Sequence, residues 1–338
     1  MILFDTTNAS SWRHASGLAR VSRRLLAGLG ASAREVRWPG LAGELGSRDW
    51  FLTPELFSEH ERPGFTAFLD RRPCGLAAVY HDAIPIKHPD ITWPASVGRH
   101  PGYMKLLARF DRVWAVSRAS REELLGFWRW QGVEHAPQVD VLELGADWEG
   151  VPRQAAPCEP SDPPRIVSTG ILEPRKNQGI LIDACEALRR EGIEMELHLV
   201  GRVNPHFGGP IARRVAGLRG HWPGLRHHVR MDDAALMRLI RSARATALAS
   251  IAEGCGLPLL ESLWLGVPCA CSDIEPFAEN AAGGGCAVAH GNSIEEWTAV
   301  LRRLLTDDGY HQRLASEAST RALPTWNSAA AILRAALA

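Results

Sequence analysis

The chain has 338 residues, of which 46% are hydrophobic and 22% charged, and its 38 basic residues balance its 38 acidic ones. This length suggests two domains, while the composition excludes a disordered chain, a coiled coil and a disulfide scaffold, and the balanced charge argues against binding to nucleic acid. Seven cysteines without zinc-type spacing favour a reduced compartment and argue against a metal site.

The first half of the sequence alternates between apolar strands and amphipathic helices. Residues 1–4 predict a strand, and the helix that follows it is expected to have Ser16 as its N-cap. Further strands are expected at 76–80 and 112–117, the second of which leads into a helix that begins near Ser120.

A proline-rich stretch at 149–164 separates this half from a second series of strands and helices. Strands are expected at 165–169, 196–200 and 245–250. Helices are expected at 178–190, 233–243, 258–265, 294–305 and 326–337. Strands that alternate with helices predict parallel sheets covered by helices on both faces. The sequence therefore predicts an α/β protein of two doubly wound, Rossmann-like domains, with ligands at the carboxyl ends of the strands and in the cleft between the domains.

The turn after strand 165–169 carries two cations, Arg175 and Lys176, directly before a helix whose expected N-cap is Asn177. The N-terminus of a helix already bears partial positive charge, so two cations there are unfavourable unless an anion such as phosphate binds beside them. A solvated basic loop explains the same residues equally well, because water screens the penalty to about a few tenths of a kcal/mol.

The turn after strand 245–250 carries two carboxylates, Glu253 and Glu261. Gly254 and Gly256, between them, allow the backbone to approach a ligand closely. Both carboxylates are expected at the carboxyl edge of the sheet, where they can accept hydrogen bonds from sugar hydroxyls. The simpler explanations are a solvated charge at Glu253 and compensation of the helix dipole by Glu261 in the first turn.

The two acids are separated by seven residues that include Gly-x-Gly-Leu-Pro, and this pattern resembles the signature of the GT4 family of retaining glycosyltransferases, which have the GT-B fold. The segment ILEPRKN at 171–177 resembles that family's pyrophosphate-binding loop. Further segments resemble the family in the expected order, namely SGLARV (16–21), YHDAIPIKHPD (80–90), VSRASREEL (116–124) and GGGCAV (283–288).

The resemblance covers nearly the whole chain, so it also implies a domain organisation. The N-terminal, acceptor-side domain would span 1–155, and the C-terminal, nucleotide-sugar-binding domain would span 156–322. A last helix, within 323–338 and beginning near Trp326, would pack back on the N-terminal domain.

The same resemblance implies a role for each matched residue. Lys176 and Arg175 would neutralise the donor diphosphate, and Glu253 would contact hydroxyls of the transferred sugar. Glu261 would contact the ribose, and His81 would form a hydrogen bond beside the transferring sugar, so that His81, Glu253 and Lys176 make up the catalytic set. Further donor contacts would come from Gly17, Gly201, Arg202, Met231, Cys255, Gly256 and Leu257.

Two positions depart from the family pattern. Cys255 stands where the family usually has an aromatic residue, and Ile171 stands where many members have arginine, a charge that Arg175 would then supply. His81 depends on the family segment around it, because a lone histidine after a strand is more often structural than ligand-binding.

Taken together, these matches imply a retaining, metal-independent hexosyltransferase that needs no cofactor. Its donor would be a nucleoside-diphosphate sugar, with GDP-mannose preferred over UDP-hexoses. Its acceptor would be a hydroxyl of a cell-surface glycan or of a polyprenyl-linked intermediate. A sugar-nucleotide 2-epimerase of the same fold and a non-catalytic protein that binds sugar nucleotides are the alternatives.

The sequence also bears on where the protein works. The first residues resemble neither a signal peptide nor a transit peptide, and no apolar run approaches 18 residues, so a cytoplasmic protein is expected. Peripheral contact with the inner membrane face through Trp114, Trp128 and Trp130 is an alternative. These tryptophans fit a core better, because Trp114 falls in a predicted strand.

Overall fold

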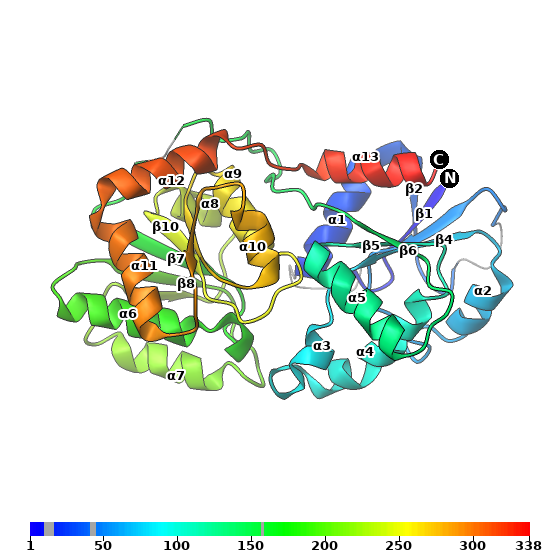
Figure 1. The fold of residues 1–338 in the computed structure, drawn as a ribbon, viewed down its shortest axis with the longest axis horizontal. Coiled ribbons are helices and arrows are strands. Elements are labelled where there is room, and N and C mark those ends of the chain that lie inside the picture. Colours follow the sequence, from blue (N-terminus) through cyan, green and yellow to red (C-terminus); the bar gives the residue numbers. More distant parts are fainter. Residues whose placement is uncertain (10–16, 41–44, 157–158) are drawn as a thin grey trace. The chain divides into compact units, whose positions relative to one another are not determined.

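The computed structural model describes residues 1–9, 17–40, 45–156 and 159–338. The chain divides into two compact units (Figure 1). Unit 1 comprises Met1–Gly145 and Pro324–Ala338, and unit 2 comprises Ala146–Leu323. Each unit is built around one six-stranded sheet whose strands all run parallel, so the α/β class with two doubly wound domains, predicted from the alternation of strands and helices, is confirmed.

In the sheet of unit 1, the first strand of the chain lies second from one edge. Its strands, in spatial order, are β2 (Ala33–Val36), β1 (Ile2–Asp5), β3 (Trp50–Thr53), β4 (Gly75–Tyr80), β5 (Arg112–Ala115) and β6 (Gln138–Val141). The chain therefore leaves β1 toward one edge and β3 toward the other, so the strand order reverses between β1 and β3. In open parallel sheets this reversal opens a crevice at the carboxyl ends of the two strands.

Helices complete unit 1. They are α1 (Gly17–Leu29), α2 (Phe65–Arg71), α3 (Ile84–Lys87), α4 (Pro94–Leu107), α5 (Arg118–Trp130) and α13 (Trp326–Ala336), with short 3-10 turns at Gly30–Ser32 and Pro89–Ile91. One core cluster joins the sheet to α2, α4 and α5. The C-terminal α13 packs on α1, and this contact needs a glycine, because a Cβ at Gly28 would lie 2.8 Å from the Cβ of Ala330.

The sheet of unit 2 repeats this arrangement. Its strands, in spatial order, are β12 (Cys286–Ala289), β11 (Cys269–Ser272), β10 (Ala245–Leu248), β7 (Arg165–Thr169), β8 (Glu196–Val200) and β9 (Leu225–His228). The chain runs from β7 toward β9 on one side and from β10 toward β12 on the other. The strand order therefore reverses between β7 and β10, and their carboxyl ends mark the expected ligand crevice of this unit.

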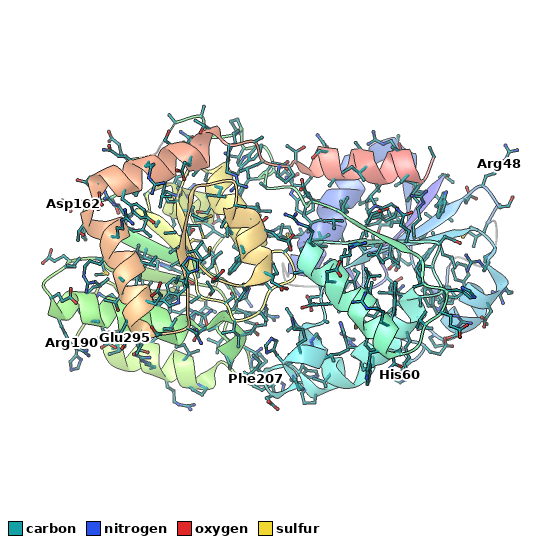
Figure 2. The ribbon with its side chains drawn as sticks, viewed as in Figure 1. Arg48, His60, Asp162, Arg190, Phe207 and Glu295 are labelled. Atoms are coloured by element: carbon teal, nitrogen blue, oxygen red, sulfur yellow. The ribbon has the colours of Figure 1, made fainter. Side chains whose placement is uncertain are left out.

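Helices cover both faces of this second sheet, because successive apolar residues of its strands point to opposite sides. They are α6 (Gln178–Arg190), α7 (Gly209–Leu218), α8 (Asp233–Arg241), α9 (Leu257–Trp264), α10 (Glu275–Ala281), α11 (Ile294–Thr306) and α12 (Asp308–Thr320). Ile166 joins the core formed with α6 and α11, whereas Val167 joins the core formed with α8. Figure 2 shows charged side chains such as Arg190 and Glu295 pointing outward from these helices.

The division between the units falls before residue 146, earlier than the boundary expected after residue 155. The reason is that the segment after Gly145 already belongs to the packing of unit 2. Trp148 enters a core cluster of that unit, and the Nε1 of Trp264 donates to the carbonyl of Val151 at 3.1 Å. The guanidinium of Arg153 is held by the backbone carbonyls of Leu263 and Ala318.

Most elements expected from the sequence are present, at bounds that differ by a few residues. Ser16, the expected cap of α1, lies outside the described residues. Trp114 and Trp128 are core residues as predicted, but Trp130 is 78% exposed, because it ends α5 on the side that faces away from the core. Within the described ranges, no helix is both long and apolar enough to cross a bilayer.

Candidate functional site

The candidate site of unit 2 is built from the two turns that follow β7 and β10. The first turn ends in a short 3-10 helix, Pro174–Lys176, and the second runs from Ala249 to Gly256 before α9 begins. The turns are joined directly, since the backbone amide of Ile251 donates to the carbonyl of Arg175 at 2.9 Å. The predicted diphosphate-binding cations and the predicted sugar-binding carboxylate therefore meet at the point where the strand order reverses.

Lys176 and Glu253 form an ion pair between the Nζ of the lysine and the Oε1 of the glutamate. The lysine side chain is 12% exposed and the glutamate side chain 11%, so the pair is largely shielded from water. Ser250 adds a hydrogen bond from its hydroxyl to the same carboxylate oxygen at 2.7 Å. The stem of the lysine lies over Gly170, where a Cβ would be only 3.3 Å from the lysine Cε.

Arg175 bridges two carboxylates in the same cluster. Its guanidinium lies 2.8 Å from Glu173 Oε1 and 3.2 Å from Glu253 Oε2. The Nδ2 of Asn204 fixes Glu173 from the other side, at 2.8 Å. Arg175 and Lys176 contribute two positive charges, and Glu173 and Glu253 contribute two negative ones, so the cluster is electrically neutral. The expected unfavourable pair of cations is therefore relieved by carboxylates of the same chain.

The protonation states follow from this pairing. Burial by itself raises the pKa of Glu253, but Lys176 and Arg175 outweigh that effect and lower it to about 2. Burial also lowers the pKa of Lys176, and the nearby Arg175 adds to this, while Glu253 acts in the opposite direction. At neutral pH the carboxylate is thus firmly ionised, and its two cationic neighbours compete for one negative charge.

Asn177 precedes α6 as expected but does not cap it with its side chain. Its backbone is left-handed, with φ +50° and ψ +34°, a conformation that asparagine tolerates better than most residues. Its Nδ2 donates to Asn292 Oδ1 at 2.6 Å instead. The prediction of a side-chain N-cap at this position is therefore wrong, because the left-handed turn directs the amide toward the loop before α11.

The segment that leads into α9 is shaped by Gly256. Its φ of +81° suits glycine, and a Cβ there would lie 2.6 Å from the ring of Phe277. Cys255 is half-buried, and its carbonyl accepts from Asn280 Nδ2 at 2.6 Å. Leu257 is the first residue of α9, so Glu261 lies beyond the first turn and is buried. Compensation of the helix dipole by an acid in the first turn is therefore wrong for Glu261.

The residues expected near the nucleobase follow β8 and β9. Gly201 has φ +150°, and a Cβ there would lie 2.1 Å from the carbonyl oxygen of Gly170, so the backbones after β7 and β8 touch. The Nε2 of His227 lies 2.8 Å from the Gly201 carbonyl. Arg202 is exposed, whereas Met231 packs on the core beside α8. Glycine is thus required at position 201 by the fold itself.

His81 and Gly17 belong to unit 1. His81 directly follows β4, is 7% exposed, and its Nε2 lies 2.7 Å from the carbonyl oxygen of Pro54. A carbonyl only accepts, so Nε2 carries the hydrogen and the neutral ring keeps its lone pair on Nδ1. Burial lowers the pKa of His81 and favours this neutral form. Gly17 begins α1, and a Cβ there would meet no atom of the described residues within 4 Å.

Sequence reasoning missed three groups that the structure places in or beside the predicted site. Glu173 lay inside the quoted ILEPRKN segment, yet only the fold shows that it pairs with Arg175. Ser250 and Asn204 carry no motif of their own. Among the described residues, no cluster of three or more His, Cys, Asp or Glu side chains has the geometry to hold a metal ion.

Known proteins show the same sequence features and the same fold. The family described as glycosyl transferases group 1 matches residues 154–321. A mannosyltransferase named WbdA, from Escherichia coli, is 28% identical over 283 residues, which are 76% of this chain and 34% of that protein. An MMP alpha-(1->4)-mannosyltransferase of Mycolicibacterium hassiacum is 29% identical over 70% of this chain and 56% of its own length. The chain thus spans about a third of the length of the first relative.

Two solved structures have the same architecture. Sucrose-phosphate synthase from Thermosynechococcus elongatus superposes with a TM-score of 0.69 and 16% identity over 98% of this chain and 96% of its own. HepE from Anabaena, solved with UDP and glucose, superposes with a TM-score of 0.68 and 17% identity over 94% of this chain and 93% of its own. At such identity the likeness shows the fold, and it is the GT-B fold that the motifs predicted. The sequence match, the fold and the motif residues agree, and residues 154–321 match the family of group 1 glycosyl transferases.

Proposed function

We propose that this protein is a retaining hexosyltransferase of the GT4 type, which moves a hexose from a nucleoside-diphosphate sugar to an acceptor hydroxyl. The observation that carries the proposal is the convergence of Lys176, Arg175 and Glu253 at the strand-order reversal of unit 2. Two cations beside a carboxylate suit a ligand that carries a diphosphate next to sugar hydroxyls. The family match of residues 154–321 supports the same class of reaction.

Donor binding requires the neutral cluster to rearrange. The diphosphate draws Lys176 and Arg175 away from Glu253, because it offers more negative charge than one carboxylate. Glu253 then turns its oxygens to the hydroxyls of the sugar. The cations act most strongly as the carbon–oxygen bond to the leaving diphosphate breaks, since negative charge develops there. The acceptor attacks from the face that the diphosphate leaves, and the diphosphate takes the proton of the acceptor hydroxyl.

His81 contributes from unit 1 as a hydrogen-bonding group. Its Nε2–H donates to the Pro54 carbonyl, so Nδ1 is the nitrogen that accepts a hydrogen bond from a sugar hydroxyl. A neutral ring suits a hydroxyl better than a phosphate, because a phosphate needs a donor. Gly17, at the start of α1, has no described atom where its Cβ would be, which leaves the backbone accessible to a ligand on the side of the described residues.

Mannose is the favoured sugar, and GDP the favoured nucleotide. The support is that the curated relatives are named as mannosyltransferases, one of them an O-antigen chain mannosyltransferase. By the same reasoning, the acceptor is a growing cell-surface glycan or its lipid-linked precursor. The reaction needs no divalent metal, because Arg175 and Lys176 supply positive charge at the diphosphate.

One experiment tests the proposal against its alternatives. The purified protein is titrated calorimetrically with GDP, UDP, dTDP and ADP, and the matching sugar nucleotides are then incubated with and without mannose-terminated acceptors. The expected result is preferential binding of GDP and acceptor-dependent transfer of mannose with retained anomeric configuration. An epimerised donor in the acceptor-free reaction would identify a 2-epimerase, and binding without turnover on any acceptor would identify a binding protein.

A further inference from the structure

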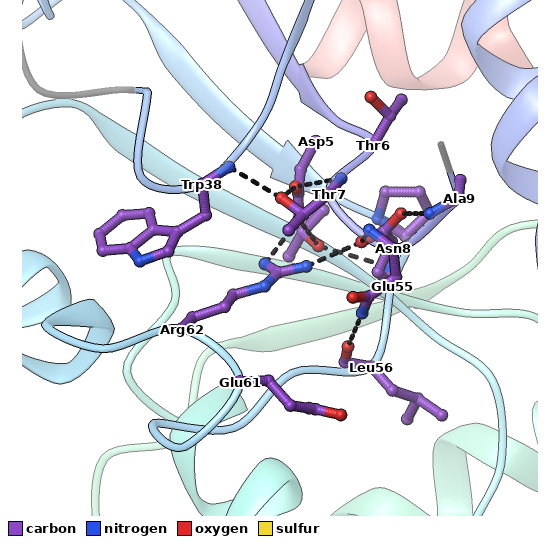
Figure 3. A network of polar contacts seen from close by, with 12 residues as sticks. Asp5, Thr6, Thr7, Asn8, Ala9, Trp38, Glu55, Leu56, Glu61 and Arg62 are labelled. Carbon is purple, nitrogen blue, oxygen red and sulfur yellow. Dashed lines mark hydrogen bonds and ion pairs between the residues drawn. The ribbon is translucent and has the colours of Figure 1, made fainter. Parts of the chain in front are cut away.

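Unit 1 has its own cluster of buried charges at its strand-order reversal (Figure 3). Asp5 ends β1, Glu55 lies two residues after the end of β3, and Arg62 lies on the segment before α2. The exposed fractions of the three residues are 1%, 1% and 0%. Charges so fully removed from water are retained only where they are paired and hydrogen-bonded.

Glu55 uses this buried position to hold the backbone that follows β1. Its Oε2 accepts the amide hydrogen of Asn8 at 2.7 Å, and its Oε1 accepts that of Ala9 at 2.6 Å. The Nη2 of Arg62 donates to Oε2 at 2.8 Å. The side-chain amide of Asn8 adds a bond to the carbonyl of Leu56 at 2.9 Å. The carboxylate of Glu55 therefore binds two successive backbone amides in the segment that follows β1.

Asp5 binds Thr7, the residue before Asn8 and Ala9. Its Oδ1 accepts from both the amide and the hydroxyl of Thr7, and its Oδ2 accepts from the hydroxyl of Thr53 at 2.6 Å. Arg62 Nη1 lies 2.6 Å from the same Oδ2, so one guanidinium serves both carboxylates. The hydroxyl of Thr7 in turn accepts the amide of Trp38 at 2.9 Å. Residues 7–9, which we term the β1 exit, are thus held by the carboxylates of Asp5 and Glu55.

The charge of the cluster is unbalanced. Asp5 and Glu55 bring two negative charges, and Arg62 brings one positive charge. The groups that face Glu55 are Asp5 from β1, Arg62 from the segment before α2, and the two amides of the β1 exit. One excess negative charge in a dry site favours uptake of a proton by one carboxylate.

We propose that Glu55 is a positioning residue, whose ionised carboxylate holds the β1 exit in the conformation that sugar transfer requires and releases it when protonated. This inference rests on the proposed function, in which His81, bound by the carbonyl of the residue before Glu55, contacts the transferred sugar. Protonation acts on geometry: Oε1 accepts the amide hydrogen of Ala9, so a proton placed on Oε1 sets a donor against a donor.

The pH at which this release occurs is set by the surroundings of Glu55. Burial and the neighbouring charge of Asp5 raise its pKa to about 7, although the amides of Asn8 and Ala9 and the charge of Arg62 act against this. Above that pH the carboxylate is ionised and both amides are held. Below it the carboxyl is protonated, and the bond to Ala9 is lost.

The same short segment also supports His81. Pro54, directly before Glu55, offers the carbonyl that binds His81 Nε2, and the hydroxyl of Ser120 holds the His81 carbonyl at 2.6 Å. A movement of Glu55 is therefore transmitted to the backbone that orients this histidine. The expected effect on catalysis is thus on turnover, while donor affinity in unit 2 stays unchanged.

Amide NMR titration of the full chain provides the test, with Glu55→Gln as the variant and Glu61→Gln as the matched control. Glu61 lies on the same segment but pairs with Arg99 and contacts none of residues 7–9. In the wild type and the control, the amide signals of Asn8 and Ala9 should move together with a midpoint near pH 7, and in Glu55→Gln this titration should vanish. A midpoint near 4.5, or the same titration in Glu55→Gln, would overturn the proposal.

Kinetics on the same proteins then tests the positioning role. Turnover by Glu55→Gln should fall at least tenfold, and its pH profile should lose the wild-type rise through pH 7, while calorimetric affinity for the donor nucleotide stays within about threefold. If Glu55→Gln kept the turnover and the pH profile of the wild type, the positioning role of Glu55 would be overturned. If Glu55→Gln does not fold, the amide titration and the pH profile of the wild type still test the proposal. If the protein shows the predicted amide titration but transfers no hexose, the result would support the hold of Glu55 on the β1 exit and contradict the proposed function.

Discussion

Lys176 and Glu253 are 77 positions apart in the sequence, yet the ammonium of one lies against the carboxylate of the other. Their turns meet because β7 and β10 are neighbours in the sheet, and because the chain leaves the two strands in opposite directions. The pair keeps the cluster neutral and keeps both side chains in place. It also means that a ligand with negative charge must replace Glu253 as the partner of the lysine.

Replacing Lys176 with alanine tests this exchange. We expect turnover to fall at least a hundredfold, which corresponds to about 2.7 kcal/mol, because the leaving diphosphate loses its nearest compensating charge. Lys105→Ala is the matched control, since Lys105 is an exposed lysine on α4 of unit 1. Steady-state kinetics on both variants, with folding checked by circular dichroism, measures the effect. If folded Lys176→Ala kept turnover within threefold of the wild type, the assignment of this lysine to the diphosphate would be wrong.

Replacing Glu253 with glutamine tests the ion pairs in the absence of donor. The variant leaves Lys176 and Arg175 without their shared carboxylate, so we expect the free energy of unfolding to fall by roughly 3 kcal/mol at neutral pH. Urea unfolding measures this, with Glu194→Gln, an exposed glutamate of the same unit, as the control. A loss no larger than that of the control would show that the pairs do not stabilise the fold.

The difference in the free energy of unfolding between the wild type and Glu253→Gln depends on pH with a definite sign. The pKa of Glu253 is about 2 in the folded protein and 4.5 ordinarily, so its contribution is present above 4.5 and is lost as the pH falls toward 2. The gap between wild type and Glu253→Gln should therefore stay constant from about pH 5 to pH 8 and narrow at more acidic pH. Urea unfolding repeated across this range would contradict the assignment if the gap narrowed between pH 5 and 8.

Gly201 provides a prediction about the fold rather than the chemistry. A Cβ there would lie 2.1 Å from the carbonyl oxygen of Gly170, and the φ of +150° disfavours any other residue. We expect Gly201→Ala to lower the free energy of unfolding by about 3 kcal/mol or more. Gly217→Ala in α7 is the control of opposite sign, because a Cβ there meets no atom within 4 Å in the part of the chain that the structure describes, and alanine favours a helix by about 1 kcal/mol. Equal stability of the two variants would contradict the close contact.

Several strands were predictable because burial leaves a continuous apolar run, although β3, which reads WFLT and lies between two other strands, was missed. ELHLV and RIVST, which become β8 and β7, are central in their sheet and were expected. The edge strands β2 and β9 read AREV and LRHH, and they were missed because an edge strand keeps polar residues on its solvent side. The strand β11 reads CACS, which carries almost no β propensity and is held in place by its neighbours on both sides.

The site was predictable only as far as its motifs reach. Arg175, Lys176 and Glu253 lie where strand ends and family segments indicated, and they do come together. Glu173 and Ser250 were missed, because their contribution depends on tertiary contacts that no spacing encodes. The side-chain cap expected of Asn177 failed for the same reason, since its left-handed backbone is set by the turn as a whole.

Removal of divalent metal is the last prediction. A leaving diphosphate needs positive charge, and in many transferases a metal ion supplies it. In the proposed function Arg175 and Lys176 supply this charge, so we expect turnover in excess EDTA to stay within about twofold of the untreated enzyme. The assay runs with and without added Mg²⁺ or Mn²⁺, and Lys105→Ala is carried alongside. A loss of turnover in EDTA that Mg²⁺ restores would mean that the two cations do not suffice and that the donor brings a metal ion with it.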